Sequence, residues 1–218
     1  MTENSVIAFK SENPIGRLPI LKVSPAVEGG RWEAKAFCGE VIPFSANVFR
    51  EGHDALAAEV LLTSPANKTQ ILRMTPGALG SDSWHASAQL NEAGKYKFQI
   101  RAFADDYETW HHNTQVKLAV GVDEELMMLE GIALFTRAAS EKGRSKANSA
   151  VLVSAAESLG DTSRSAQARF ASVETPEVLK AVTDQPIRSL VTLSDVFVIN
   201  CERTLAGSAA WYEFFPRS

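Results

Sequence analysis

Apolar and polar positions alternate with a period of two over most of residues 18–120. Four apolar side chains share one parity in residues 40–49, namely Ile42, Phe44, Ala46 and Val48. Such alternation is typical of strands that bury one face. Pro43 in the same segment indicates an edge strand or a bulge, because proline has no N–H for the ladder.

Further segments repeat this pattern between turn residues. Residues 56–63 and 69–74 flank the sequence Ser-Pro-Ala-Asn and indicate a hairpin. Residues 83–90 and 95–102 alternate almost perfectly around a Glu-Ala-Gly turn. After Asp105 and Asp106 we predict one more strand, whose apolar parity holds Trp110, His112, Thr114, Val116 and Leu118. About seven strands at this turn spacing predict an immunoglobulin-like or fibronectin-like antiparallel β-sandwich.

The period changes at Gly121, and the following block is helical. Asp123 is a predicted helix cap, and Glu124 and Glu125 follow where the helix dipole favours negative charge. Apolar residues then recur at helical spacing towards Gly143. Further helices are predicted over residues 145–159, with Gly160 as the stop, over residues 164–172, and from Thr175-Pro176 onward.

After Asp195 the pattern becomes strand-like again, so the helices are inserted before the last strands. We therefore predict an α+β fold: a sandwich over residues 1–121 completed by 196–218, and a bundle of about four helices over 122–195. The aromatic segment that ends in Phe214 and Phe215 needs a surface to pack on. We expect the natural polypeptide to continue beyond Ser218.

Composition and charge narrow the class of protein. The chain has 218 residues, 45% of them hydrophobic and 22% charged, with a net charge of −4, which is typical of a globular protein. The first 120 residues hold no face rich in Lys and Arg, which argues against a nucleic-acid partner. The first residues are polar, and no apolar run approaches a membrane span, so we expect a cytoplasmic protein that does not bind membranes. Cys38 and Cys201 are then expected to be free thiols.

The residues that could carry chemistry do not converge in the sequence. If residues 107–118 form a strand, His111 and His112 point to opposite faces and cannot easily share a metal ion. Asp105-Asp106 and Glu124-Glu125 are explained by a turn and a helix start. No nucleophile elbow or phosphate loop is present. We expect no catalytic residue, no metal and no cofactor.

Two features are candidates for recognition. The loop Arg50-Glu51-Gly52-His53-Asp54 carries more charge than a turn requires, although a solvated turn remains the simpler interpretation. Four tryptophans occur, and exposed aromatic side chains on a sandwich can stack on sugar rings. Because Trp84 and Trp110 lie on apolar parities, we expect both to pack in the core.

Several motifs resemble one protein family in the same order along the chain. They are Gly16-Arg17-Leu18-Pro19-Ile20, Val23-Ser24-Pro25, Glu28-Gly29-Gly30-Arg31-Trp32, Val48-Phe49-Arg50-Glu51-Gly52-His53-Asp54, Arg73-Met74-Thr75-Pro76-Gly77 and Ala210-Trp211-Tyr212-Glu213-Phe214-Phe215-Pro216-Arg217-Ser218. Together they resemble the N-terminal region of the bacterial maltose-1-phosphate maltosyltransferases, and the resemblance covers nearly the whole chain.

The resemblance implies a β-sandwich joined to a helical spacer bundle, both part of the dimer interface of a cytosolic homodimer. That enzyme extends α-1,4-glucan with maltosyl units, using catalytic carboxylates in an α-amylase-like barrel. The barrel would lie downstream of Ser218, so no catalytic residue is carried onto this sequence. We therefore expect a scaffold for dimerisation and barrel docking. The interface candidates are Arg50, Glu51, His53, Asp54, Trp211, Tyr212, Phe214 and Phe215.

Two other functions stay open at this point. The region can instead be a module that binds α-glucan through exposed aromatic side chains, or a free-standing protein-interaction domain. A barrel with amylase-type carboxylates in the reading frame beyond Ser218 would favour the scaffold or the glucan-binding module. A natural stop codon there would favour the free-standing domain.

Overall fold

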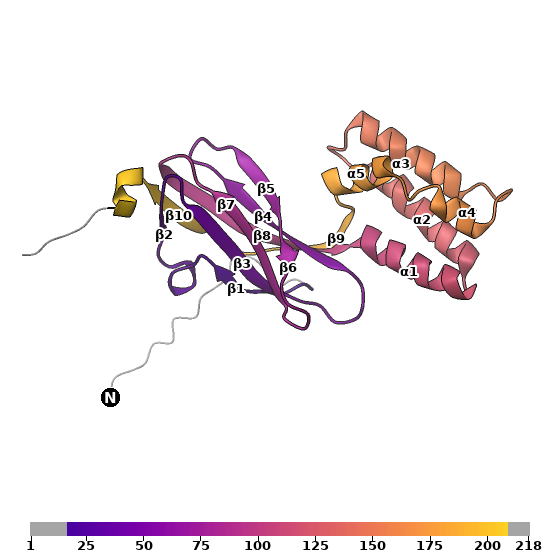
Figure 1. Cartoon of the computed structure of the whole chain (residues 1–218), viewed down its shortest axis with the longest axis horizontal. Helices are drawn as coiled ribbons and strands as arrows, with labels where there is room; N and C mark the ends of the chain where they lie inside the picture. Colours follow the sequence, from indigo (N-terminus) through magenta and orange to yellow (C-terminus); the bar gives the residue numbers. More distant parts are fainter. Residues whose placement is uncertain (1–16, 209–218) are drawn as a thin grey trace, which may run out of the picture. The chain divides into compact units, whose positions relative to one another are not determined.

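A computed structural model describes residues 17–208, which form two compact units (Figure 1). Of the described residues, the first unit holds 17–51, 57–103 and 190–208, and it contains the strands of a sandwich. The second unit holds Gly52–Leu56 and Ala104–Ser189 and contains the helices. The predicted α+β architecture, a β-sandwich with a helical insertion before the last strands, is confirmed.

One sheet of the sandwich has the strand order β1-β3-β7-β6. Its strands are β1 (Ile20–Ser24), β3 (Val41–Val48), β7 (Ser83–Gln89) and β6 (Thr75–Pro76). The predicted strand over residues 40–49 is therefore β3, and its predicted apolar face is buried. Pro43 lies beyond the part of β3 that pairs with β1, because that irregular pairing stops at Ser45. The missing N–H of Pro43 is therefore tolerated, although other parts of β3 have a paired strand on each side.

The second sheet has the strand order β2-β10-β8-β4-β5, and β9 also pairs with β8. Its strands are β2 (Ala34–Phe37), β10 (Phe197–Glu202), β8 (Gly94–Asp105), β4 (Leu56–Thr63), β5 (Thr69–Arg73) and β9 (Arg188–Leu193). The predicted hairpin is formed by β4 and β5, which pair antiparallel. The neighbours β2 and β10 run parallel although they lie far apart in the sequence.

Aromatic side chains from both sheets meet in the sandwich core. Phe44 of the first sheet contacts Phe98 of the second edge-to-face at 5.0 Å between ring centroids. Phe98 in turn stacks on Phe197 at 5.3 Å. These geometries are among those that aromatic pairs prefer, and they fix the packing of one sheet on the other. Trp84 is half-buried on the predicted apolar side of β7.

The helical unit holds five helices among the described residues. They are α1 (Asp106–Val120), α2 (Glu124–Ala139), α3 (Lys146–Leu159), α4 (Ala166–Ala171) and α5 (Pro176–Asp184). Side chains of Ser145, Ser165 and Thr175 cap α3, α4 and α5 by accepting backbone N–H bonds. Rings of Trp110 and Phe170 pack edge-to-face in the core of this unit. The four helices predicted after residue 122 are present.

The strand predicted over residues 107–118 is wrong, because this segment is helix α1. The buried residues of α1 are Tyr107, Trp110, Thr114 and Leu118, which recur at helical spacing. Trp110, Thr114 and Leu118 are all even-numbered, so the strand pattern, with its period of two, predicted the same three side chains to be buried. Val116 would be buried with Thr114 and Leu118 in a strand, but its side chain is exposed, as expected for a helix. Asp105 caps the helix, accepting the Glu108 N–H at 3.2 Å.

One boundary and one helix cap differ from prediction. The helical unit begins near Ala104 rather than at residue 122. Asp123 lies at the predicted N-cap position of α2, but its backbone is left-handed and its side chain makes no cap bond. Its carboxylate instead pairs with Lys117 of α1 at 3.1 Å, across the tight α1–α2 turn. Among residues 17–208, no helix combines the length and apolar character needed to cross a bilayer.

Candidate functional site

The loop predicted to be a recognition site connects β3 to β4. Glu51, His53 and Asp54 are exposed, Arg50 is half-buried, and Gly52 takes a positive φ of 96° that turns the chain. The loop is divided between the units after Glu51. The structure therefore assigns Arg50 and Glu51 to the sandwich, and His53 and Asp54 to the helical unit. The four candidate residues of this loop thus belong to two different units.

Arg50 and Glu51 line a surface pocket of the sandwich of about 480 Å³. The other lining residues are Arg17, Pro19, Phe49 and Leu190. Two guanidinium groups beside an apolar wall are suited to a carboxylate on a polypeptide segment, since arginine pairs with carboxylates in a two-pronged geometry. The pocket thus has the chemistry of a contact surface. An acid–base pair for catalysis would need opposed carboxylates, and Glu51 is the only carboxylate in this lining.

One histidine of α1, His111, has structural partners. Nε2 of His111 donates to Glu174 Oε1 at 3.2 Å, and its ring stacks on Tyr107. Because this segment is helical, the reason given above for His111 and His112 not sharing a metal does not apply. Among residues 17–208, no group of three or more His, Cys, Asp or Glu side chains is placed to hold a metal ion.

The paired carboxylates stabilise the fold. Asp106 accepts from Arg137 at 2.5 Å and from Ser189 at 2.6 Å. Glu125 pairs with the buried Arg169, and Glu124 accepts from Gln167 at 3.1 Å. These partners give Asp106, Glu124 and Glu125 structural roles.

Burial also holds Tyr107 in its neutral form. Desolvation, with smaller effects of nearby carboxylates, raises the pKa of Tyr107 to about 12. The hydroxyl therefore stays protonated near neutral pH and is unsuited to act as a general base there.

Comparison with known proteins gives the family. Residues 16–203 match the family model described as alpha-1,4-glucan:maltose-1-phosphate maltosyltransferase, domain N/S. The chain belongs to this family. We refer to it below as the N/S region.

Curated relatives carry the same name. The N/S region is 40% identical over 218 residues to alpha-1,4-glucan:maltose-1-phosphate maltosyltransferase 1 of Streptomyces coelicolor, covering 97% of this chain and 32% of that protein. A second maltosyltransferase of the same organism is 39% identical, with 94% and 30% covered. The enzyme of Corynebacterium pseudotuberculosis is 35% identical, with 93% and 30% covered. The N/S region thus spans about a third of the length of these relatives.

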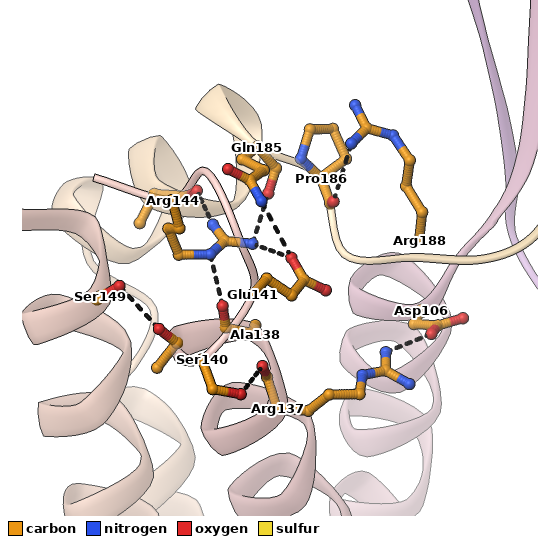
Figure 2. Close-up of polar contacts among 12 residues, drawn as sticks. Asp106, Arg137, Ala138, Ser140, Glu141, Arg144, Ser149, Gln185, Pro186 and Arg188 are labelled. Atoms are coloured by element: carbon orange, nitrogen blue, oxygen red, sulfur yellow. Dashed lines mark hydrogen bonds and ion pairs between the residues drawn. The ribbon is translucent and has the colours of Figure 1, made fainter. Parts of the chain in front are cut away.

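One polar centre of the N/S region was not predicted from the sequence. Arg144 follows α2, and its side chain is fully buried. Figure 2 shows its guanidinium among the C-terminal ends of two helices. Nε donates to the Ala138 carbonyl at 2.7 Å and Nη1 to the Ala181 carbonyl at 2.8 Å. Nη2 donates to Glu141 at 2.8 Å and to the Gln185 carbonyl at 2.9 Å.

Arg144 therefore joins the end of α2 to the end of α5. A cation suits both places, because the carbonyl ends of helices carry partial negative charge. The only local signal in the sequence is a basic residue directly after Gly143, the expected end of a helix. That signal gives no information on a partner about 40 residues away.

The predicted interface residues Trp211, Tyr212, Phe214 and Phe215 lie outside the described residues.

Proposed function

We propose that the N/S region is a non-catalytic scaffold of a maltosyltransferase that elongates α-1,4-glucan from maltose-1-phosphate. In this proposal it contributes to a homodimer and docks the catalytic barrel of the same polypeptide. The enzymatic part of the proposal rests on family membership and on the names of the relatives. The scaffold part rests on the surface of the helical unit.

One observation supports the scaffold role: five aliphatic side chains of the α1–α2 hairpin are exposed, and we refer to them together as the patch. The patch consists of Val116, Val120, Val122, Leu126 and Leu129, each between 47% and 68% exposed. Val116 and Val120 lie about half a helical turn away from the buried Thr114 and Leu118. Large exposed apolar patches commonly mark missing partners.

The patch favours a protein partner over a small ligand. Full burial of an aliphatic side chain contributes about 1.5–3 kcal/mol, so covering five half-exposed ones contributes on the order of 5 kcal/mol. The loss of translational and rotational freedom on association is of similar size. A second copy held by this patch alone would therefore dissociate easily, and contacts elsewhere in the complete polypeptide must add to it.

A charge placed in the patch tests the proposal. In the complete polypeptide, Leu129→Glu should weaken the dimer at least about tenfold in sedimentation equilibrium, because an unpaired carboxylate is costly to bury. Leu179→Glu is the matched control, since Leu179 lies on α5 and is 55% exposed. A dimer that keeps its dissociation constant in Leu129→Glu and in Val120→Glu would refute this assignment.

The charged loop is proposed as a second contact of the scaffold. Arg50→Ala and His53→Ala in the complete polypeptide should weaken dimerisation or lower the melting temperature while glucan affinity stays unchanged. A raised Michaelis constant for the glucan acceptor in an intact dimer would instead assign the loop to glucan. If neither quantity changes, the loop is a passive turn.

The alternative, a glucan-binding module, is supported by one side chain. Trp32 is 57% exposed, its indole N–H donates to Glu28 Oε2 at 3.1 Å, and Arg31 lies against its ring. A fixed, exposed indole can stack on a sugar ring. Trp32→Ala should then abolish the quenching of tryptophan fluorescence by maltoheptaose, whereas Trp84→Phe, which changes a half-buried ring, should preserve it. Unchanged quenching in Trp32→Ala would exclude this site.

A further inference from the structure

Two cysteines distant in the sequence are neighbours at one edge of the sandwich. Cys38 directly follows β2, and Cys201 lies on β10, the parallel neighbour of β2. The Cys38 N–H donates to the Glu202 carbonyl at 2.8 Å, which fixes the end of β2 beside β10. Both cysteines are free thiols, and their Sγ atoms are 3.8 Å apart.

The two thiols differ in access and in ionisation. Cys38 is half-buried, whereas Cys201 is 2% exposed, so a small oxidant reaches Cys38 first. Burial, with a smaller contribution from Cys38, raises the pKa of Cys201 to about 11. Cys201 therefore stays a neutral thiol near neutral pH. Its position suits it to react second, with an oxidised Cys38.

We propose that Cys38 and Cys201 form an oxidisable pair that closes into a disulfide when the protein meets a peroxide. The sulfurs are 3.8 Å apart and must approach by about 1.7 Å to reach bonding distance. Side-chain rotation can supply a movement of this size. Transient disulfides that respond to oxidants are the kind found in reducing compartments.

The reaction balances with hydrogen peroxide as the oxidant. The Cys38 thiol loses its proton, the thiolate attacks one peroxide oxygen, and the O–O bond breaks. The products are Cys38 sulfenic acid and a hydroxide, which takes up the released thiol proton and becomes water. The Cys201 sulfur then attacks the sulfenic sulfur, the S–O bond breaks, and the leaving hydroxide takes the Cys201 proton as a second water. Two thiols lose two electrons in total, and one peroxide gains them.

Closure would tie the edge strand β2 to β10 and to the segment that follows. Thr204 in η2 (Thr204–Ser208) donates to the Cys38 carbonyl at 3.4 Å. A Cβ at Gly207 would lie only 2.9 Å from the Phe37 ring, so η2 packs closely against the end of β2. The disulfide would therefore hold η2 in place together with β2 and β10.

Peptide mapping of the peroxide-treated chain tests the proposal. After treatment with one equivalent of hydrogen peroxide and alkylation under denaturing conditions, we expect a Cys38–Cys201 linked peptide within a single chain. The melting temperature should rise by at least about 5 °C, because the link closes a loop of 163 residues, and fall back with dithiothreitol.

Single-cysteine variants provide the controls. Neither Cys38→Ser nor Cys201→Ala should show the rise in melting temperature after peroxide treatment. If Cys201→Ala fails to fold, Cys38→Ser still provides the test, because it leaves the buried Cys201 unchanged. Three outcomes in the wild-type chain would overturn the proposal: both thiols alkylate fully after peroxide, the link joins two chains, or Cys38 proceeds to sulfinic acid while Cys201 stays free.

Discussion

Replacing Arg144 should destabilise the helical unit more than replacing a typical arginine. Its guanidinium makes four hydrogen bonds, to the Ala138, Ala181 and Gln185 carbonyls and to the Glu141 carboxylate. The change Arg144→Met keeps most of the aliphatic stem but removes every one of these donors. It therefore tests the polar centre rather than the packing of the side chain.

The expected loss follows from the environment of each acceptor. Ala138 keeps a second donor, the Glu141 N–H at 3.1 Å, and the Glu141 side chain is partly exposed and can be hydrated. The cost then falls mainly on the carbonyls of Ala181 and Gln185, each of which loses a bond to a charged donor worth about 1.5–3 kcal/mol. Together these give a loss of about 3–6 kcal/mol, which agrees with the ~3–5 kcal/mol lost when one partner of a buried ion pair is removed.

Urea unfolding followed by far-UV circular dichroism measures this loss. For a helical unit of this size we expect the melting temperature to fall by about 12 °C or more and the urea midpoint to fall without a change in slope. Arg137→Met is the matched control, since Arg137 is half-exposed and pairs with Asp106 at 2.5 Å. That surface pair should contribute less than about 1 kcal/mol. A loss below about 1 kcal/mol in Arg144→Met would refute the reasoning.

Two further predictions concern packing and pH. Gly131→Ala should lower the free energy of unfolding by about 1–2 kcal/mol, because the new Cβ would lie 2.4 Å from Trp110. The control Gly160→Ala, whose Cβ would lie 3.4 Å from its nearest neighbour, should change the free energy of unfolding by less than about 1 kcal/mol. Equal losses for the two variants in urea unfolding would contradict this prediction. Hydrogen bonds, first that from Lys180, lower the pKa of Asp184, so its stabilising contribution is present above the ordinary aspartate pKa and lost as pH falls through the lowered one. An NMR titration should find this lowered pKa in the wild type and a higher one in Lys180→Met, and equal values would contradict the assignment.

The strands of the sandwich were predictable because one face of each is buried. In β3 and β8 the period of two is set by side chains that alternate between core and solvent, and this pattern is visible in the sequence alone. The prediction failed in residues 107–118, where Trp110, Thr114 and Leu118 are separated by multiples of four. Such spacing fits both periods, and the exposure of His112 and Val116 separates them.

Contacts between distant segments were not predictable. The proximity of Cys38 to Cys201 depends on the parallel pairing of β2 and β10, which no local pattern specifies. The four hydrogen bonds of Arg144 depend in the same way on how α2 and α5 end beside one another. The hydrophobic periodicity predicted the fold but no family. The sequence motifs predicted the link to the maltosyltransferases, and the family match confirms it.

As proposed above, this N/S region organises an enzyme and performs no chemistry itself. The most direct measurement is phosphate release from maltose-1-phosphate by the rigorously purified chain, with maltohexaose as the acceptor. Residues 17–208 show no opposed pair of carboxylates free of structural partners at the sites considered above, so release should not exceed that of the heat-denatured chain. Phosphate release that saturates with maltose-1-phosphate would contradict the account.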